Sequence, residues 1–152
     1  MYTRPSFQRL RYDRRALRRF LVFALPLLVL TMALFRFAEE ALGMAPDPGR
    51  LSPWETVRLP GWVMLATWGL ESVGLAALFL MIQGRGGRWL AGLLAGWIAW
   101  VFRGPLLVVT VASLAGLPPG PWWALVLSWW VLYTLCGLVL GGVASAAGLQ
   151  SY

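Results

Sequence analysis

Four long apolar stretches occupy most of the 152 residues of this chain. They cover residues 20–38, 61–82, 89–117 and 122–147. An α-helix rises about 1.5 Å per residue, so about 20 apolar residues cross the roughly 30 Å of hydrocarbon in a bilayer. The pattern therefore predicts an all-α, polytopic integral membrane protein in which residues 20–147 form a single bundle of four transmembrane helices.

The composition excludes several classes of chemistry. Hydrophobic residues make up 59% of the chain and charged residues only 12%. All 13 basic residues are Arg, and the sequence has neither Lys nor His. This excludes His-ligated haem, His-containing zinc sites, an imidazole general base and a Lys Schiff base. Cys136 is the only cysteine, so no internal disulfide forms. We expect no catalytic residue, no metal and no cofactor.

A basic segment, residues 1–19, precedes the first stretch. Its arginines favour a helix on anionic headgroups, where each basic group contributes on the order of 1 kcal/mol. Nucleic-acid binding is not expected, because the segment adjoins a span and has no recognition module. The basic segment is long for a signal peptide, and a small-residue cleavage site is missing. We therefore expect the first stretch to be an uncleaved transmembrane span. The predicted lipid-surface residues are Arg9, Arg11, Arg14, Arg15, Arg18 and Arg19.

The distribution of Arg among the loops predicts the orientation. Short loops rich in Arg stay on the cytoplasmic side. The second loop, residues 83–88, has two Arg and no acid, whereas the charges of the first loop nearly balance and residues 118–121 have none. We expect both ends, including the tail of residues 148–152, to be cytoplasmic. The charge bias and the scarcity of cysteine suit a bacterial inner membrane.

The first loop contains a capping-box pattern, Ser52-Pro53-Trp54-Glu55. It predicts a short amphipathic helix that lies along the outer interface. The alternative is a loop in which the pattern occurs by chance.

Two charges lie near the middle of predicted spans, Glu71 in the second and Arg103 in the third. An unpaired charge there costs about 2.5–3.5 kcal/mol on insertion scales. The short loop makes these spans neighbours, and the two charges lie at similar depth. We expect Glu71 and Arg103 to form an ion pair that faces the bundle interior.

The pair has two possible meanings, which the sequence leaves open. In one, it permanently holds the register of the two helices. In the other, Glu71 takes up and releases a proton, and the pair acts as a switch. Gly104-Pro105, directly after Arg103, supports the second meaning as a candidate hinge, because Pro105 cannot donate to the carbonyl of Val101.

Several tryptophans lie too deep to belong to the interfacial belts. Together with Thr67 they predict a pocket for an aromatic, cationic or pigment-like ligand. The alternative is that they fill space and contact lipid, and we favour it. The candidate pocket residues, besides Gly104 and Pro105, are Thr67, Trp68, Trp100, Trp129 and Trp130.

Small residues form stripes on the third and fourth spans. Gly92 and Gly96 are spaced by four residues on the third, and Gly137 and Gly141 on the fourth. Such spacing allows close helix packing. The stripes meet each other or, alternatively, another subunit.

Three functions remain. We favour a non-catalytic accessory or scaffold subunit of a larger membrane assembly, whose partners are other membrane subunits or further copies of the chain. The alternative is a small proton-coupled transporter or channel with Glu71 as titrating group and Arg103 as counter-ion. A membrane enzyme ranks last, because the spans offer no nucleophile beside a base.

Overall fold

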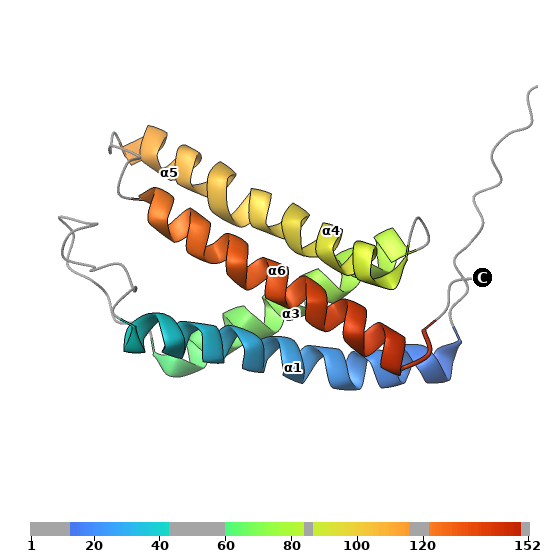
Figure 1. Ribbon diagram of the computed structural model, residues 1–152. Helices are drawn as coiled ribbons and strands as arrows, with labels where there is room; N and C mark the ends of the chain where they lie inside the picture. Colours follow the sequence, from blue (N-terminus) through green and yellow to red (C-terminus); the bar gives the residue numbers. More distant parts are fainter. Residues whose placement is uncertain (1–12, 43–59, 84–86, 116–121, 150–152) are drawn as a thin grey trace, which may run out of the picture.

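A computed structural model describes residues 13–42, 60–83, 87–115 and 122–149 of the chain (Figure 1). All of its regular elements are helices, and four of its helical segments are long and apolar enough to cross a membrane, so the predicted all-α class and the four candidate spans are confirmed within these residues. In chain order the elements are α1 (Arg14–Ala41), α3 (Gly61–Ile82), α4 (Arg88–Val101), η2 (Phe102–Leu106), α5 (Leu107–Ala115) and α6 (Trp123–Ala146).

The start of α1, the end of α3, the start of α4 and the end of α6 lie at one end of the bundle (Figure 1). We call this the basic end, because arginines of α1 and α4 gather there: Arg14, Arg15, Arg18, Arg19 and Arg88. The end of α1 and the starts of α3 and α6 lie at the opposite end. Which end faces the cytoplasm stays a prediction, and the capping box at 52–55 lies outside the described residues.

Helix α1 is longer than the first apolar stretch and extends past both of its ends. Asp13 caps its start by accepting a hydrogen bond from the amide of Arg15 at 3.0 Å. Arg14, Arg15, Arg18 and Arg19 therefore lie in the first turns of the same helix. At the other end, Glu39 and Glu40 belong to the last turns of α1, although the apolar pattern predicts that the first span ends at residue 38.

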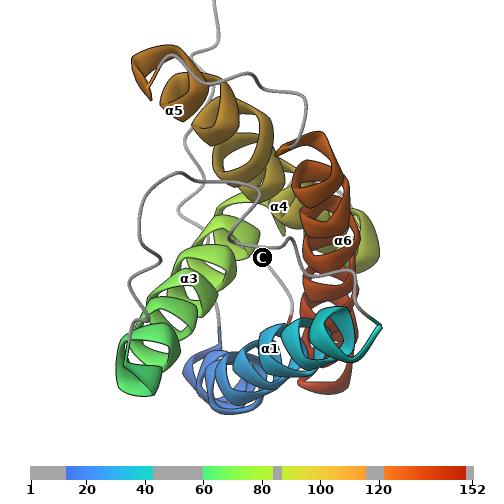
Figure 2. The same cartoon turned by 90° about the vertical axis from the view of Figure 1, so that its left-hand side faces the viewer.

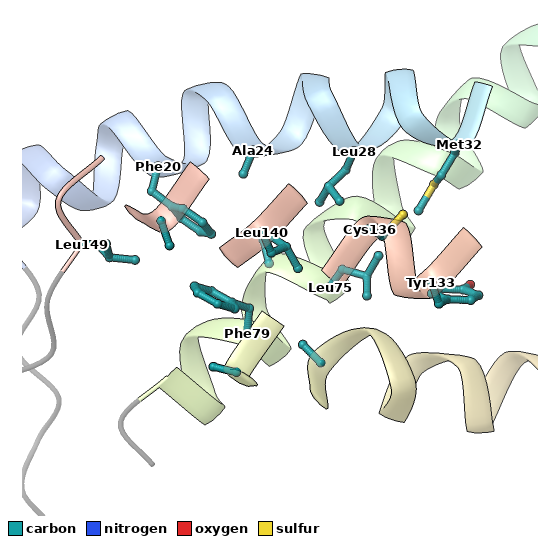
Figure 3. Close-up of a cluster of buried hydrophobic side chains, with 14 residues drawn as sticks. Phe20, Ala24, Leu28, Met32, Leu75, Phe79, Tyr133, Cys136, Leu140 and Leu149 are labelled. Atoms are coloured by element: carbon teal, nitrogen blue, oxygen red, sulfur yellow. The ribbon is translucent and has the colours of Figure 1, made fainter. Parts of the chain in front are cut away.

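The core lies where α1, α3, α4 and α6 meet. Four residues of α1 spaced by four positions, Phe20, Ala24, Leu28 and Met32, face this core, as one helical face requires (Figure 3). Phe20 stacks on Phe79 of α3 with ring centroids 5.3 Å apart. The outward faces of the helices stay apolar and exposed, as lipid contact requires.

Helices α4 and α6 approach each other most closely, and their small-residue stripes meet. A methyl group on Gly92 would overlap the carbonyl oxygen of Gly137, and one on Gly96 would overlap that of Tyr133. A methyl group on Gly141 would lie 3.0 Å from the ring of Trp89. Only glycine therefore allows these two backbones to come together.

The end of α6 is tied to the connection between α3 and α4. Gly148 takes a left-handed conformation with φ +66°, and the amide of Leu149 then bonds to the carbonyl of Ala144 at 3.0 Å. The carbonyl of Leu149 accepts hydrogen bonds from Gln83 Nε2 and Arg88 Nε, each at 3.0 Å. These bonds close the basic end, whereas α3 and α5 diverge toward the opposite end (Figure 2).

Candidate binding cavity

Glu71 and Arg103 are brought together by α3 and η2. The guanidinium Nε of Arg103 lies 3.3 Å from Oε1 of Glu71. The two side chains differ in exposure, because 16% of the Glu71 side chain is accessible but 43% of the Arg103 side chain. The carboxylate is thus set into the helix interface, while much of the guanidinium stays accessible.

A π-helical turn carries Arg103. Phe102–Leu106 forms the π-helix η2 between α4 and α5. Pro105 has no amide hydrogen, and in a regular α-helix its ring would press against the carbonyl of Val101. Widening the helix by one residue relieves this crowding, and such turns often occur at functional sites. At Gly104-Pro105 the structure has a widened turn in an otherwise continuous helix, and the hinge motion at this turn stays a prediction.

Two tryptophans hold the turn against α6. The indole of Trp100 donates a hydrogen bond to the carbonyl of Val126 at 2.8 Å. The same indole covers buried Gly104, where an added methyl group would lie 3.1 Å from Trp100 Nε1. The guanidinium carbon of Arg103 lies 5.8 Å from the ring centroid of Trp129, within the range of a cation–π contact.

A second ion pair lies on α1, in the same half of the bundle. Arg36 Nη1 lies 3.2 Å from Oε2 of Glu39, and Arg36 Nε lies 3.5 Å from Oε1 of Glu40. The hydroxyl of Ser128 on α6 donates a hydrogen bond to the other carboxylate oxygen of Glu39. Only 7% of the Glu39 side chain is accessible, against 39% of the Arg36 side chain.

The two ion pairs line one cavity of about 310 Å³. Four elements enclose it: the last turns of α1, the first half of α3, the turn η2 and the first half of α6. It therefore lies in the half of the bundle away from the basic end. Its lining residues are Met32, Phe35, Arg36, Glu39, Met64, Trp68, Glu71, Arg103, Leu125, Trp129, Leu132 and Tyr133.

No family model, no curated protein and no solved structure matches this chain. Among the described residues, no three His, Cys, Asp or Glu residues gather in a way that could hold a metal ion.

The cavity includes some of the predicted pocket residues and leaves out others. Trp68 and Trp129 line it. Trp100 packs behind the turn η2, Trp130 is 42% exposed, and Thr67 bonds to its own helix through the carbonyl of Val63 at 2.8 Å. Gly104 and Pro105 shape the turn that presents Arg103 without lining the cavity.

Sequence reasoning missed the contribution of α1. The predicted first span ends at residue 38, so Glu39 and Glu40, the partners of Arg36, fall in the predicted loop. Their spacing of three and four positions is that of stabilising ion pairs along a helix. That spacing was the available signal, and it would have extended the first helix by a turn.

The described residues among those predicted to contact lipid lie at the basic end, away from the cavity. Arg14, Arg15, Arg18 and Arg19 occupy the first turns of α1, and all four are exposed. Arg9 and Arg11 lie outside the described residues.

Proposed function

We propose that this chain is an integral membrane protein whose cavity carries a small charged solute, coupled to protonation of Glu71. The observation that supports this proposal is the position of the Glu71–Arg103 pair on the wall of a cavity. A pair that only held two helices in register would be enclosed by packed side chains, whereas 43% of the Arg103 side chain is accessible. The cavity thus moves our preference from the accessory subunit to the transporter.

The coupling follows from the charges that face Glu71. While Glu71 is ionised, its carboxylate holds the guanidinium of Arg103 by charge-assisted hydrogen bonding. Protonation removes that attraction and leaves the guanidinium available to a solute. Arg36 and Glu39 of α1 and Tyr133 of α6 share the cavity wall, and Cys136 of α6 interacts electrostatically with Glu71. Arg36 and Glu39 belong to one helix, and Ser128 also holds Glu39, so we assign the exchange of partners to Arg103 and Glu71.

The proposal assigns no catalytic step to the chain. We propose the bacterial inner membrane as its location, from the charge bias and the scarcity of cysteine.

A flux assay tests the proposal. The full chain is reconstituted in liposomes that contain a pH-sensitive dye, and acetate, inorganic phosphate, chloride, methylammonium and the anionic amphiphile dodecyl phosphate are added outside in turn. We expect one of these solutes to accelerate internal pH change, and Glu71→Gln to abolish the acceleration while circular dichroism stays unchanged. Glu40→Gln is the matched control, because Glu40 is an exposed carboxylate outside the cavity. A Glu71→Gln variant as active as the wild type would remove the proposal, as would wild-type liposomes no faster than empty ones.

The accessory subunit is the second candidate, and the surface of α5 favours it. One face of α5, with Val108 and Ala112, is buried, whereas Val109 and Leu114 are 50% and 85% exposed. Such a face can contact lipid or pack against a partner helix, and for this candidate function we propose the partner helix. Native purification in a mild detergent tests it: a stable companion supports the accessory role, and a lone monomer or homodimer contradicts it.

A further inference from the structure

A second hollow adjoins the cavity on the side of α3 and the turn η2. It is a groove of about 410 Å³ between α3, the α4–η2–α5 helix and α6. The groove and the cavity share three lining residues, Glu71, Arg103 and Tyr133. The remaining wall of the groove is apolar, with Leu78 on one side and Phe102 and Leu107 on the other. The ion pair therefore lies where the cavity that holds the charged residues meets an apolar groove.

The groove lies along the flank of the bundle, where the chain would face lipid. Helices α3 and α5 diverge on this side (Figure 2). Phe102 is 66% and Leu107 44% exposed, so the wall formed by η2 and α5 is accessible from outside the bundle. An apolar molecule dissolved in the bilayer can thus reach Arg103 without passing through water.

The charged side chains that line the cavity favour an anionic ligand. Both carboxylates that line it are the less accessible partners of their pairs, and Glu39 is held by Arg36 and Ser128. The accessible polar groups are the guanidinium N–H donors of Arg36 and Arg103. Among the described residues, Nε of Arg103 contacts Glu71. The guanidinium carbon of Arg103 lies over the ring of Trp129. A planar array of donors of this kind suits a carboxylate or a phosphate.

We propose that the transported solute is an anionic amphiphile from the bilayer, whose headgroup binds Arg103 in the cavity and whose apolar tail lies in the groove between α3 and the η2–α5 helix. The inference rests on the proposed function and names its substrate class. The headgroup competes with Glu71 for the guanidinium, so its binding and the protonation of Glu71 support each other. No covalent bond changes.

Equilibrium binding of radiolabelled dodecanoate to the full chain in nanodiscs of zwitterionic lipid tests the inference. We expect saturable binding that unlabelled dodecanol and dodecyltrimethylammonium do not displace at equal concentration. Arg103→Gln should weaken binding about tenfold or more, because it removes a charge-assisted contact. Arg18→Gln is the matched control, since it removes the same charge at the basic end. If dodecanol displaced the label as effectively as dodecanoate, the inference would be overturned, because the site would not distinguish a charged headgroup from a neutral one.

The groove is tested separately from the charge. Gly74 lines the groove, and a Cβ atom there meets no atom within 4 Å, so the side chain of Gly74→Leu starts in open space and fills part of the groove. We expect this variant to weaken dodecanoate binding, and Gly69→Leu, also with open space around it but outside the groove, to leave binding unchanged. Unchanged binding in Gly74→Leu would overturn the placement of the tail and hence the inference. This arm does not depend on the stability of the Arg103 variant.

The two proposals fail in different ways. Dodecanoate binding that persists alongside an active Glu71→Gln transporter would remove the proton coupling and leave the amphiphile site in place. Flux of a small solute that depends on Glu71, without any dodecanoate binding, would remove the amphiphile and leave the proposed function in place.

Discussion

At the scale of single residues, the molecule is distinguished by two acids whose charges are matched locally. Glu71 is paired across two helices with Arg103, and Glu39 is paired within one helix with Arg36. In both pairs the acid is nearly enclosed and the arginine remains accessible. The enclosed carboxylate depends on its partner, because a buried charge without one is costly.

A double-mutant cycle on Glu71 and Arg103 measures this dependence. We expect Glu71→Gln and Arg103→Gln each to lower the free energy of unfolding in detergent micelles. The double variant should lose about 1–2 kcal/mol less than the sum of the two, because a buried group left alone costs more than the absent pair. Additive effects within about 0.5 kcal/mol would contradict a direct interaction.

At the scale of helices, the contact between α4 and α6 holds the bundle together on one side and leaves it open on the other. Gly92, Gly96 and Gly137 let these two backbones touch. The antiparallel pair forms a rigid support for the turn η2, and through it for Arg103. Glu71 of α3 pairs with Arg103 beside the groove, on the side where α3 and α5 diverge (Figure 2).

Substitution of the close-packed glycines tests the role of this contact. Gly96→Ala would place a methyl group against the backbone of Tyr133, which cannot move without shifting α6. We expect a loss of about 1–3 kcal/mol in the free energy of unfolding. Gly69→Ala is the control: its methyl group meets open space, and the higher helix propensity of Ala should make it neutral or stabilising by up to about 1 kcal/mol. Equal effects of the two substitutions would contradict the packing argument.

At the scale of the whole molecule, polar and charged groups are divided between the two ends. Basic residues gather where α1 begins and α6 ends, while the cavity with its two ion pairs lies in the opposite half. An arginine-rich end is retained in the cytoplasm. The cavity would then lie toward the outer side of the membrane.

Cysteine labelling in intact cells checks this orientation. The native Cys136 is fully buried and should not react with a membrane-impermeant thiol reagent. Three matched Ser→Cys variants report the two ends and the first loop. We expect Ser52→Cys to be labelled in intact cells, and Ser6→Cys and Ser151→Cys to be labelled only after lysis. The reverse pattern would place the basic end outside.

The sequence alone determined the class of the protein and the number of its candidate spans, because length and apolarity are local properties of each stretch. It also predicted that Glu71 and Arg103 face each other, since helical periodicity and a short loop relate the two positions. The sequence could not predict the cavity or its lining residues, because a cavity depends on how far the four helices diverge. That distance is decided by contacts between elements remote in the sequence, such as the glycine contact of α4 with α6 and the Ser128–Glu39 hydrogen bond. The tertiary structure alone therefore decided which of the deep tryptophans line the cavity and that α1 contributes the second ion pair.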